Sequence, residues 1–248
     1  MSTRATGGVL VAVCTAHGVR DDDGRVGCTG IDKRPRTGPV TVAADVLDGD
    51  LICDELHHGG RDQAVYAYAR EEAQRWATEL GREVPPGWFG ENLTVDGLAV
   101  TDAVIGERWR IGGDRLGAAV LEVTLPRIPC MTFSRWVQEP HWVKRFTERG
   151  DVGAYLRVVR PGIIAAGDVV EVEDSPEHGV TVRQLFTGAD PSALARLLEL
   201  GQDLPAKAVA AAEQVLARAG RGTPTRPRTG ETSAIPLPDH HPTDRMSR

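Results

Sequence analysis

Short apolar runs rich in β-branched residues recur along the chain up to about residue 172. Each run is about as long as a β-strand. Glycine and proline lie between many of the runs, as at Gly112-Gly113 and Pro161-Gly162, and these residue types end strands. The strands that this pattern predicts cover residues 8–16, 40–46, 64–69, 92–95, 108–111, 118–125, 155–159 and 169–172.

One segment in the first half has the period of an amphipathic helix. Over residues 70–80 the apolar positions are Ala73, Trp76, Ala77 and Leu80, and Gly81 follows as a stop. Many short strands with only one or two inserted helices favour a closed or nearly closed β-barrel over a Rossmann sheet. We therefore expect a mainly β protein of the α+β class.

The composition changes after residue 186, where alanine and leucine become frequent. Helices are expected over residues 191–200 and 206–219, with Asp190 as the N-cap of the first and Pro191 in its first turn. Residues 221–248 are polar and contain several prolines, which predicts a disordered tail. The predicted division is a barrel domain over 1–178, a helical extension over 179–220 and the tail.

Composition and charge narrow the function classes. The 248 residues are 41% hydrophobic and 26% charged, as in ordinary globular proteins. The formal net charge of −6 argues against a nucleic-acid partner. No apolar run approaches the roughly 18 residues that a membrane span requires, so we expect no membrane association.

The cysteines lie at positions 14, 28, 53 and 130 and show no CxxC spacing. This pattern does not support a disulfide framework, a zinc ribbon or an iron–sulfur cluster, and no signal segment is recognised. The chain also lacks GxGxxG, Walker, HExxH and GxSxG motifs. We therefore expect a cytoplasmic protein with reduced thiols and without the usual nucleotide or hydrolase signatures.

Cys130 is the strongest candidate for chemistry. It ends the segment Pro126-Arg127-Ile128-Pro129-Cys130, in which two prolines restrict the backbone after an apolar strand. Arg127 would favour the thiolate, the form that binds metals and attacks electrophiles, and a helix beginning after Cys130 would add to this effect. A buried structural cysteine is the equally weighted alternative.

Two further motifs combine reactive side chains with turns. His58 precedes Gly59 and Gly60, whose backbone can approach a ligand closely, although glycine pairs more often only make turns. Glu91 and Asn92 can present a carboxylate and an amide to a pocket, or form a charged turn with an Asx cap.

Two cationic segments can each be explained in two ways: their side chains bind a ligand, or they lie in solvent or in a salt bridge. Lys33 and Arg34 are expected in a loop, where they can meet a phosphate or lie solvated at the surface. Arg157 lies inside an apolar strand, where an unpaired charge is costly. It therefore needs either a carboxylate or an anionic ligand.

The order of these motifs resembles that of MOSC-domain proteins, in the stand-alone bacterial branch with a helical extension. The resemblance covers roughly residues 8–215. It rests on GIDK at 30–33, HHGG at 57–60 with DQAVY at 62–66, FGENLT at 89–94, IGERW at 105–109, PRIPC at 126–130 and GAYLRV at 153–158.

The resemblance implies a MOSC-like β-barrel that binds a molybdenum cofactor, with Cys130 as a sulfur ligand of the metal. The residues that it implies around the pterin and phosphate are Lys33, His58, Gly59, Gly60, Glu91, Asn92, Arg127 and Arg157. It further implies reduction of N-hydroxylated compounds to amines, with His58 or Glu91 as proton donor. Because the chain carries no dinucleotide motif or cysteine cluster, an external flavin or iron–sulfur reductase is implied as electron donor.

Other functions stay open at this stage. Cys130 can instead serve a sulfur carrier or a cofactor-binding module through a persulfide or thiolate. A Cys130–His58 dyad can also support hydrolysis, because such pairs need proximity in space and not in sequence. A purely structural protein is the fallback. The oligomeric state is open, with a homodimer as one option.

Overall fold

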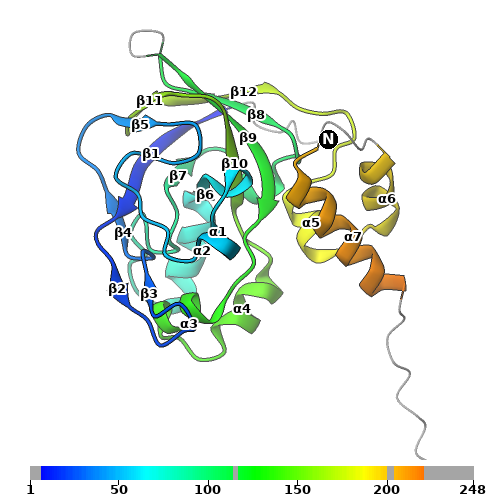
Figure 1. Cartoon of the computed structure of the whole chain (residues 1–248), viewed down its shortest axis with the longest axis horizontal. Coiled ribbons are helices and arrows are strands. Elements are labelled where there is room, and N and C mark those ends of the chain that lie inside the picture. Colours follow the sequence, from blue (N-terminus) through cyan, green and yellow to red (C-terminus); the bar gives the residue numbers. More distant parts are fainter. Residues whose placement is uncertain (1–6, 114–116, 200–203, 221–248) are drawn as a thin grey trace, which may run out of the picture.

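The computed structural model describes residues 7–113, 117–199 and 204–220. Its centre is a sheet with the strand order β12-β8-β9-β10-β6-β7-β1-β4, in which an additional β12–β1 pairing closes seven strands into a barrel (Figure 1). The sheet strands are β1 (Gly7–Ala16), β4 (Lys33–Pro35), β6 (Val65–Ala69), β7 (Leu93–Asp96), β8 (Arg108–Ile111), β9 (Ala119–Pro126), β10 (Ala154–Arg160) and β12 (Val169–Asp174). The fold is therefore the mainly β, α+β barrel that the sequence predicts.

The remaining strands form two small pairs and the helices lie between the strands and after them. The small pairs are β2 (Arg20–Asp21) with β3 (Cys28–Thr29), and β5 (Val40–Val42) with β11 (Gly162–Ile164). The helices are α1 (Glu55–His58), η1 (Arg61–Gln63), α2 (Arg70–Leu80), η2 (Val100–Asp102), α3 (Met131–Val137), α4 (Trp142–Arg149), α5 (Val182–Thr187), α6 (Pro191–Glu199) and α7 (Ala206–Gly220).

Strand β1 closes the barrel. It pairs antiparallel with β12, with β7 and, at its far end, with β4. The β6–β7 pair is parallel, and α2 makes the crossover between these strands. A parallel pair requires such a connection, because a tight turn cannot join strands that run in the same direction.

Burial follows the apolar runs. All eight residues of β9 are buried, as expected for a strand covered on both faces. Helix α2 has the predicted bounds and buries Trp76, and it ends where Gly81 takes a left-handed φ of 62°. Trp76, Trp142 and Phe146 form part of an aromatic cluster with Phe89 and Phe133 at one end of the barrel.

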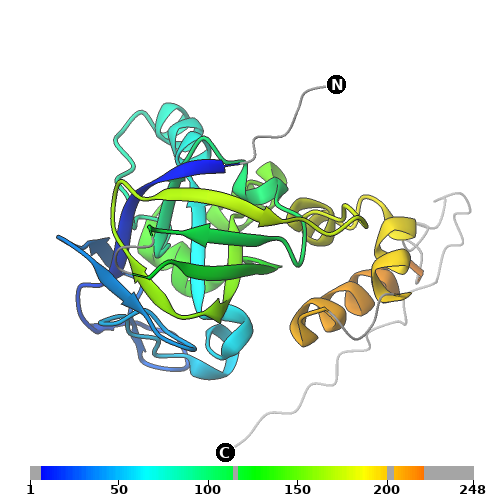
Figure 2. The same ribbon diagram turned by 90° about the horizontal axis from the view of Figure 1, so that it is seen from above.

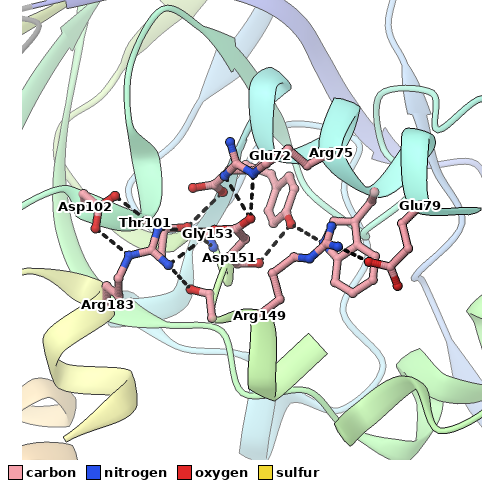
Figure 3. Close-up of polar contacts among 12 residues, drawn as sticks. Glu72, Arg75, Glu79, Thr101, Asp102, Arg149, Asp151, Gly153 and Arg183 are labelled. Carbon is pink, nitrogen blue, oxygen red and sulfur yellow. Dashed lines mark hydrogen bonds and ion pairs between the residues drawn. The ribbon is translucent and has the colours of Figure 1, made fainter. Parts of the chain in front are cut away.

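A partly buried polar network joins α2 to the C-terminal part of the chain (Figure 3). Asp151 accepts hydrogen bonds from Arg75 of α2 at 2.8 Å and from Arg183 of α5 at 3.3 Å. Beside it, the Thr101 hydroxyl donates to Glu72 at 2.9 Å and accepts from the Gly153 amide at 2.9 Å. These contacts give the buried carboxylates of Asp151 and Glu72 hydrogen-bond partners.

The three C-terminal helices lie together at one side of the barrel (Figures 1 and 2). Helix α5 packs against β9 and η2, and α6 packs against α7. Asp190 accepts a hydrogen bond from the Ala193 amide at 2.9 Å, which is the N-cap contact expected from the sequence. The domain limits at 178 and 220 stay predictions, and the predicted tail lies outside the described residues.

Several local predictions were wrong. Lys33 and Arg34 lie in strand β4 and not in a loop, because β1 offers them a pairing partner. The strand predicted over 40–46 is limited to β5, and a turn follows it. His58 ends the short helix α1, where the sequence predicted a loop. Helices α4 and α5 were not predicted.

Candidate functional site

The structure contains a pocket of about 570 Å³. We call it the Cys130 pocket and define it by Lys33, His58, Asn92, Arg127, Cys130 and Tyr155, which all line it. These residues come from β4, α1, the segment before β7, the segment between β9 and α3, and β10. The fold therefore gathers five of the predicted site residues, although they are far apart in the sequence.

Cys130 occupies the N-cap position of α3 in an extended conformation, with φ −121° and ψ 172°. Burial raises the pKa of its thiol, but His58, Arg127 and the backbone amide of Phe133 favour the thiolate and lower the pKa to about 7. The His58 side chain acts mainly through a hydrogen bond to the sulfur. By contrast, burial in β1 raises the pKa of Cys14 far above its usual value. Cys130 is therefore a partly ionised thiol at neutral pH.

Arg127 carries a buried positive charge beside this thiol. Its side chain is only 6% exposed, donates to the Phe89 carbonyl at 2.8 Å and places its guanidinium carbon 3.6 Å from the centre of the Phe133 ring. In the described part of the chain it makes no ion pair. A desolvated cation needs a negative partner, and the Cys130 thiolate or an anionic ligand in the pocket can supply it.

Lys33 and Asn92 meet at Asp50, a residue that the sequence analysis did not single out. Asp50 Oδ2 accepts from Lys33 Nζ at 2.7 Å and from Asn92 Nδ2 at 2.8 Å, and Oδ1 accepts from the Ala16 amide at 2.9 Å. The Asp48-Gly49-Asp50 segment has the composition of a turn, so nothing local distinguishes this aspartate. Its carboxylate fixes the lysine and the amide at the pocket wall.

Glu91 lies behind the pocket wall and not among its lining residues. Its buried carboxylate accepts from the Gly87 amide at 2.6 Å, from the Phe89 amide at 3.0 Å and from the Thr94 hydroxyl at 2.9 Å. Burial raises its pKa against the lowering effect of these hydrogen bonds. Glu91 therefore holds the loop before β7, residues 87–92, which places Asn92.

Three other predicted residues also lie outside the lining. Arg157 pairs with the buried Glu122 at 2.5 Å, the salt bridge that the sequence analysis kept as its alternative. The Gly59 carbonyl accepts from Lys207 Nζ of α7 at 2.8 Å, and Gly60 turns the chain with φ 89°. Gly59 therefore contacts α7, and Gly60 leads the chain into η1.

Two tyrosines of the lining were missed by sequence reasoning. Tyr66 of β6 donates to the Val152 carbonyl at 2.8 Å, and burial raises its pKa. Tyr155 of β10 has a raised pKa for the same reason and hydrogen-bonds Gln63. Both lie in the quoted motifs DQAVY and GAYLRV, so the motifs marked the right segments without indicating which side chain faces the pocket.

The family model of the MOSC domain matches residues 54–171, a range that contains His58, Arg127 and Cys130. The chain is 34% identical over 161 residues to the uncharacterized protein YflK of Bacillus subtilis, covering 65% of this chain and 71% of YflK. The chain therefore belongs to the MOSC-domain family.

Two further comparisons describe its relatives. A protein of Gibberella moniliformis named "Reductase" is 31% identical over 149 residues, which are 59% of this chain and 26% of that protein. The crystal structure of YiiM from Geobacillus stearothermophilus has the same fold, with a TM-score of 0.67 and 24% identity, over 84% of this chain and 99% of YiiM. Within the described residues, no helix has the length and apolarity to cross a bilayer.

Proposed function

We propose that the protein is a molybdenum cofactor-dependent reductase that converts N-hydroxylated compounds to amines. The observation that carries the proposal is Cys130, a thiol with a pKa of about 7 at the wall of a large pocket, next to the buried guanidinium of Arg127. Membership of the MOSC family and the relative named "Reductase" support it.

The donor set fits the cofactor. A thiolate is a soft ligand that suits molybdenum, and Cys130 would supply it. The buried guanidinium of Arg127 would neutralise negative charge on the bound group, and Lys33 and Asn92 would contact its polar periphery. When bound, the cofactor would supply a metal that takes up an oxygen atom in a two-electron step.

The residues of the chain would bind and orient the cofactor and the substrate, and would supply the proton. Asp50 holds Lys33 and Asn92 at fixed positions, and Glu91 holds the loop that carries Asn92. His58 lines the pocket whereas Glu91 does not, so we assign proton donation to His58 and a positioning role to Glu91. An external flavin or iron–sulfur reductase would supply the electrons, and the protein would work in the cytoplasm.

The test is elemental analysis of protein from a host that makes the cofactor, together with reduction of an N-hydroxylated base by an artificial electron donor. We expect near-stoichiometric molybdenum and activity in the wild type, and loss of both in Cys130→Ser. Cys53→Ser, which changes another cysteine of the same pocket, should retain molybdenum. Wild-type protein without molybdenum, from a host that loads another molybdoenzyme, would refute the proposal.

A sulfur carrier is the second candidate, because the same ionised thiol can carry a persulfide. It predicts a sulfur adduct on Cys130 after incubation with a cysteine desulfurase and a cysteine donor, detected by mass spectrometry. Molybdenum-free protein that gains this adduct and passes the sulfur to an acceptor would favour the carrier over the reductase.

A further inference from the structure

The wall of the Cys130 pocket contains two further cysteines on neighbouring segments. Cys28 lies in β3, and Cys53 lies in the segment before α1. Both side chains are half-buried, both are free thiols, and both line the pocket. They are therefore open to small molecules from the same cavity as Cys130.

The backbones of the two segments approach closely. A Cβ atom added to Gly30 would lie 2.3 Å from the Leu51 carbonyl oxygen, so Gly30 and Leu51 face each other at a distance that only glycine permits. Cys28 and Cys53 lie two residues away on the two segments, and their side chains share a hydrogen bond. A disulfide needs Cα atoms about 4.4–6.8 Å apart, a spacing that contacting thiols on adjacent segments can reach.

The two thiols are in direct contact and are not equivalent. Burial, together with the hydrogen bond and the charge interaction with Cys28, raises the pKa of Cys53 to about 11. Cys53 therefore keeps its proton at neutral pH and shares it with the Cys28 sulfur. One cysteine can thus attack an electrophile, and the other can then attack the resulting mixed disulfide.

A metal site would need more ligands than this pair. In the described ranges, no group of three or more histidine, cysteine, aspartate or glutamate side chains is arranged to hold a metal ion. A tetrahedral zinc site takes four ligands, or three with an open position. Two contacting thiols match a disulfide better than a metal.

We propose that Cys28 and Cys53 form a redox-active dithiol, which exchanges with small disulfides of the glutathione class that enter the Cys130 pocket. The Cys28 thiolate attacks one sulfur of the small disulfide, forms a mixed disulfide and releases the first thiolate. The Cys53 thiol loses its proton and attacks the Cys28 sulfur, releasing the second thiolate. The sum is one small disulfide and two cysteine thiols giving one Cys28–Cys53 disulfide and two small thiols.

The exchange is independent of the proposed reductase activity and can be measured on protein with or without bound cofactor. Reduced protein is incubated with oxidised glutathione, free thiols are blocked with iodoacetamide, and tryptic peptides are analysed by mass spectrometry. Each cysteine falls in a different tryptic peptide, at residues 5–20, 26–33, 37–61 and 128–135. A disulfide between any two cysteines is therefore assigned without ambiguity.

We expect peptides 26–33 and 37–61 to be linked in the wild type and in Cys130→Ser. In Cys53→Ser, glutathione should remain on Cys28, with roughly tenfold more adduct than in the wild type because no resolving thiol removes it. Cys28→Ser and Cys28→Ala should both lose the link, and thermal melts of the reduced variants check that they fold. A link from Cys130 to either cysteine, or no modification of residue 28, would overturn the proposal.

Discussion

The imidazole of His58 hydrogen-bonds the sulfur of Cys130, joining the last residue of α1 to the residue that precedes α3. Arg127 lies on the same chain segment as the sulfur and adds a buried positive charge. The thiolate is thus stabilised from two separate parts of the chain. Substitutions at His58 or at Arg127 are therefore expected to shift the pKa of the Cys130 thiol.

Replacing His58 with glutamine should raise the pKa of Cys130 from about 7 toward the usual range of a free thiol. Loss of one hydrogen bond to a charged group corresponds to about one pH unit. The rate of Cys130 alkylation by iodoacetamide, followed against pH on peptide 128–135, reports the midpoint. Cys53→Ser should leave that midpoint where it is, and an unchanged midpoint in His58→Gln would show that the imidazole does not act on the sulfur.

Replacing Arg127 with methionine should raise the same midpoint and reduce molybdenum retention. Methionine keeps an unbranched apolar stem against Phe133 and removes only the charge. Arg127→Lys should restore part of the midpoint shift, because it returns a cation without the planar contact to the ring. Equal midpoints for the methionine and lysine variants would mean that charge is not the cause.

Glu72 makes the stability of the protein depend on pH. Burial raises its pKa from the ordinary 4.5 to about 7, and Asp151 acts in the same direction, whereas Thr101, Arg183 and Arg75 oppose it. Below pH 4.5 the carboxyl is protonated in the folded and unfolded states and costs nothing. As pH rises from 4.5 to 7 the unfolded chain ionises first, so stability falls by about 3 kcal/mol across this window.

Glu72→Gln should remove this fall, because glutamine stays neutral and can still accept the hydrogen bond from Thr101. The measurement is urea unfolding of both proteins at pH 5 and pH 8. The variant should be more stable than the wild type by about 1 kcal/mol at pH 5 and by about 3 kcal/mol at pH 8. If the variant and the wild type were equally stable at both pH values, Glu72 would not ionise between pH 5 and pH 8.

Arg157→Met should destabilise the fold without emptying the pocket. The substitution removes the partner of the buried Glu122 and leaves Arg108 at 3.2 Å from the same carboxylate. We expect a loss of about 1–3 kcal/mol in the free energy of unfolding. Molybdenum content and the Cys130 midpoint should be unchanged, and a specific loss of molybdenum at full stability would restore Arg157 to the cofactor shell.

Local patterns were sufficient for elements whose signal lies within the segment itself. The strand at 108–111 and the helix at 70–80 have the predicted bounds, because apolar period and stop residues define them. Strand β4 was missed because Lys33–Pro35 is polar and becomes a strand only by pairing with β1. Helix α4 was missed for another reason: it is only eight residues long, so the helical spacing of its buried Trp142 and Phe146 is seen only once.

The candidate site shows a similar division. Cys130, Arg127 and His58 were found because their residue types are chemically distinctive in their motifs, and the structure brings them together. A charged residue inside an apolar strand indicates that it has a partner, but the sequence does not indicate which residue that partner is. For Arg157 that partner is Glu122, and for Glu91 it is the backbone of its own loop. Asp50 carries no local signal because its role depends on Lys33 and Asn92 from other segments.

The pairing of β1 with both β7 and β12 also bears on how the chain reaches its native state. The first strand can complete its ladder only when the last strand of the barrel is available. Contacts of such large sequence separation carry a high loop-closure cost and slow folding. During synthesis, the edge of β1 that pairs with β12 therefore stays open until residues 169–174 have left the ribosome, and an open strand edge is a site for non-native pairing.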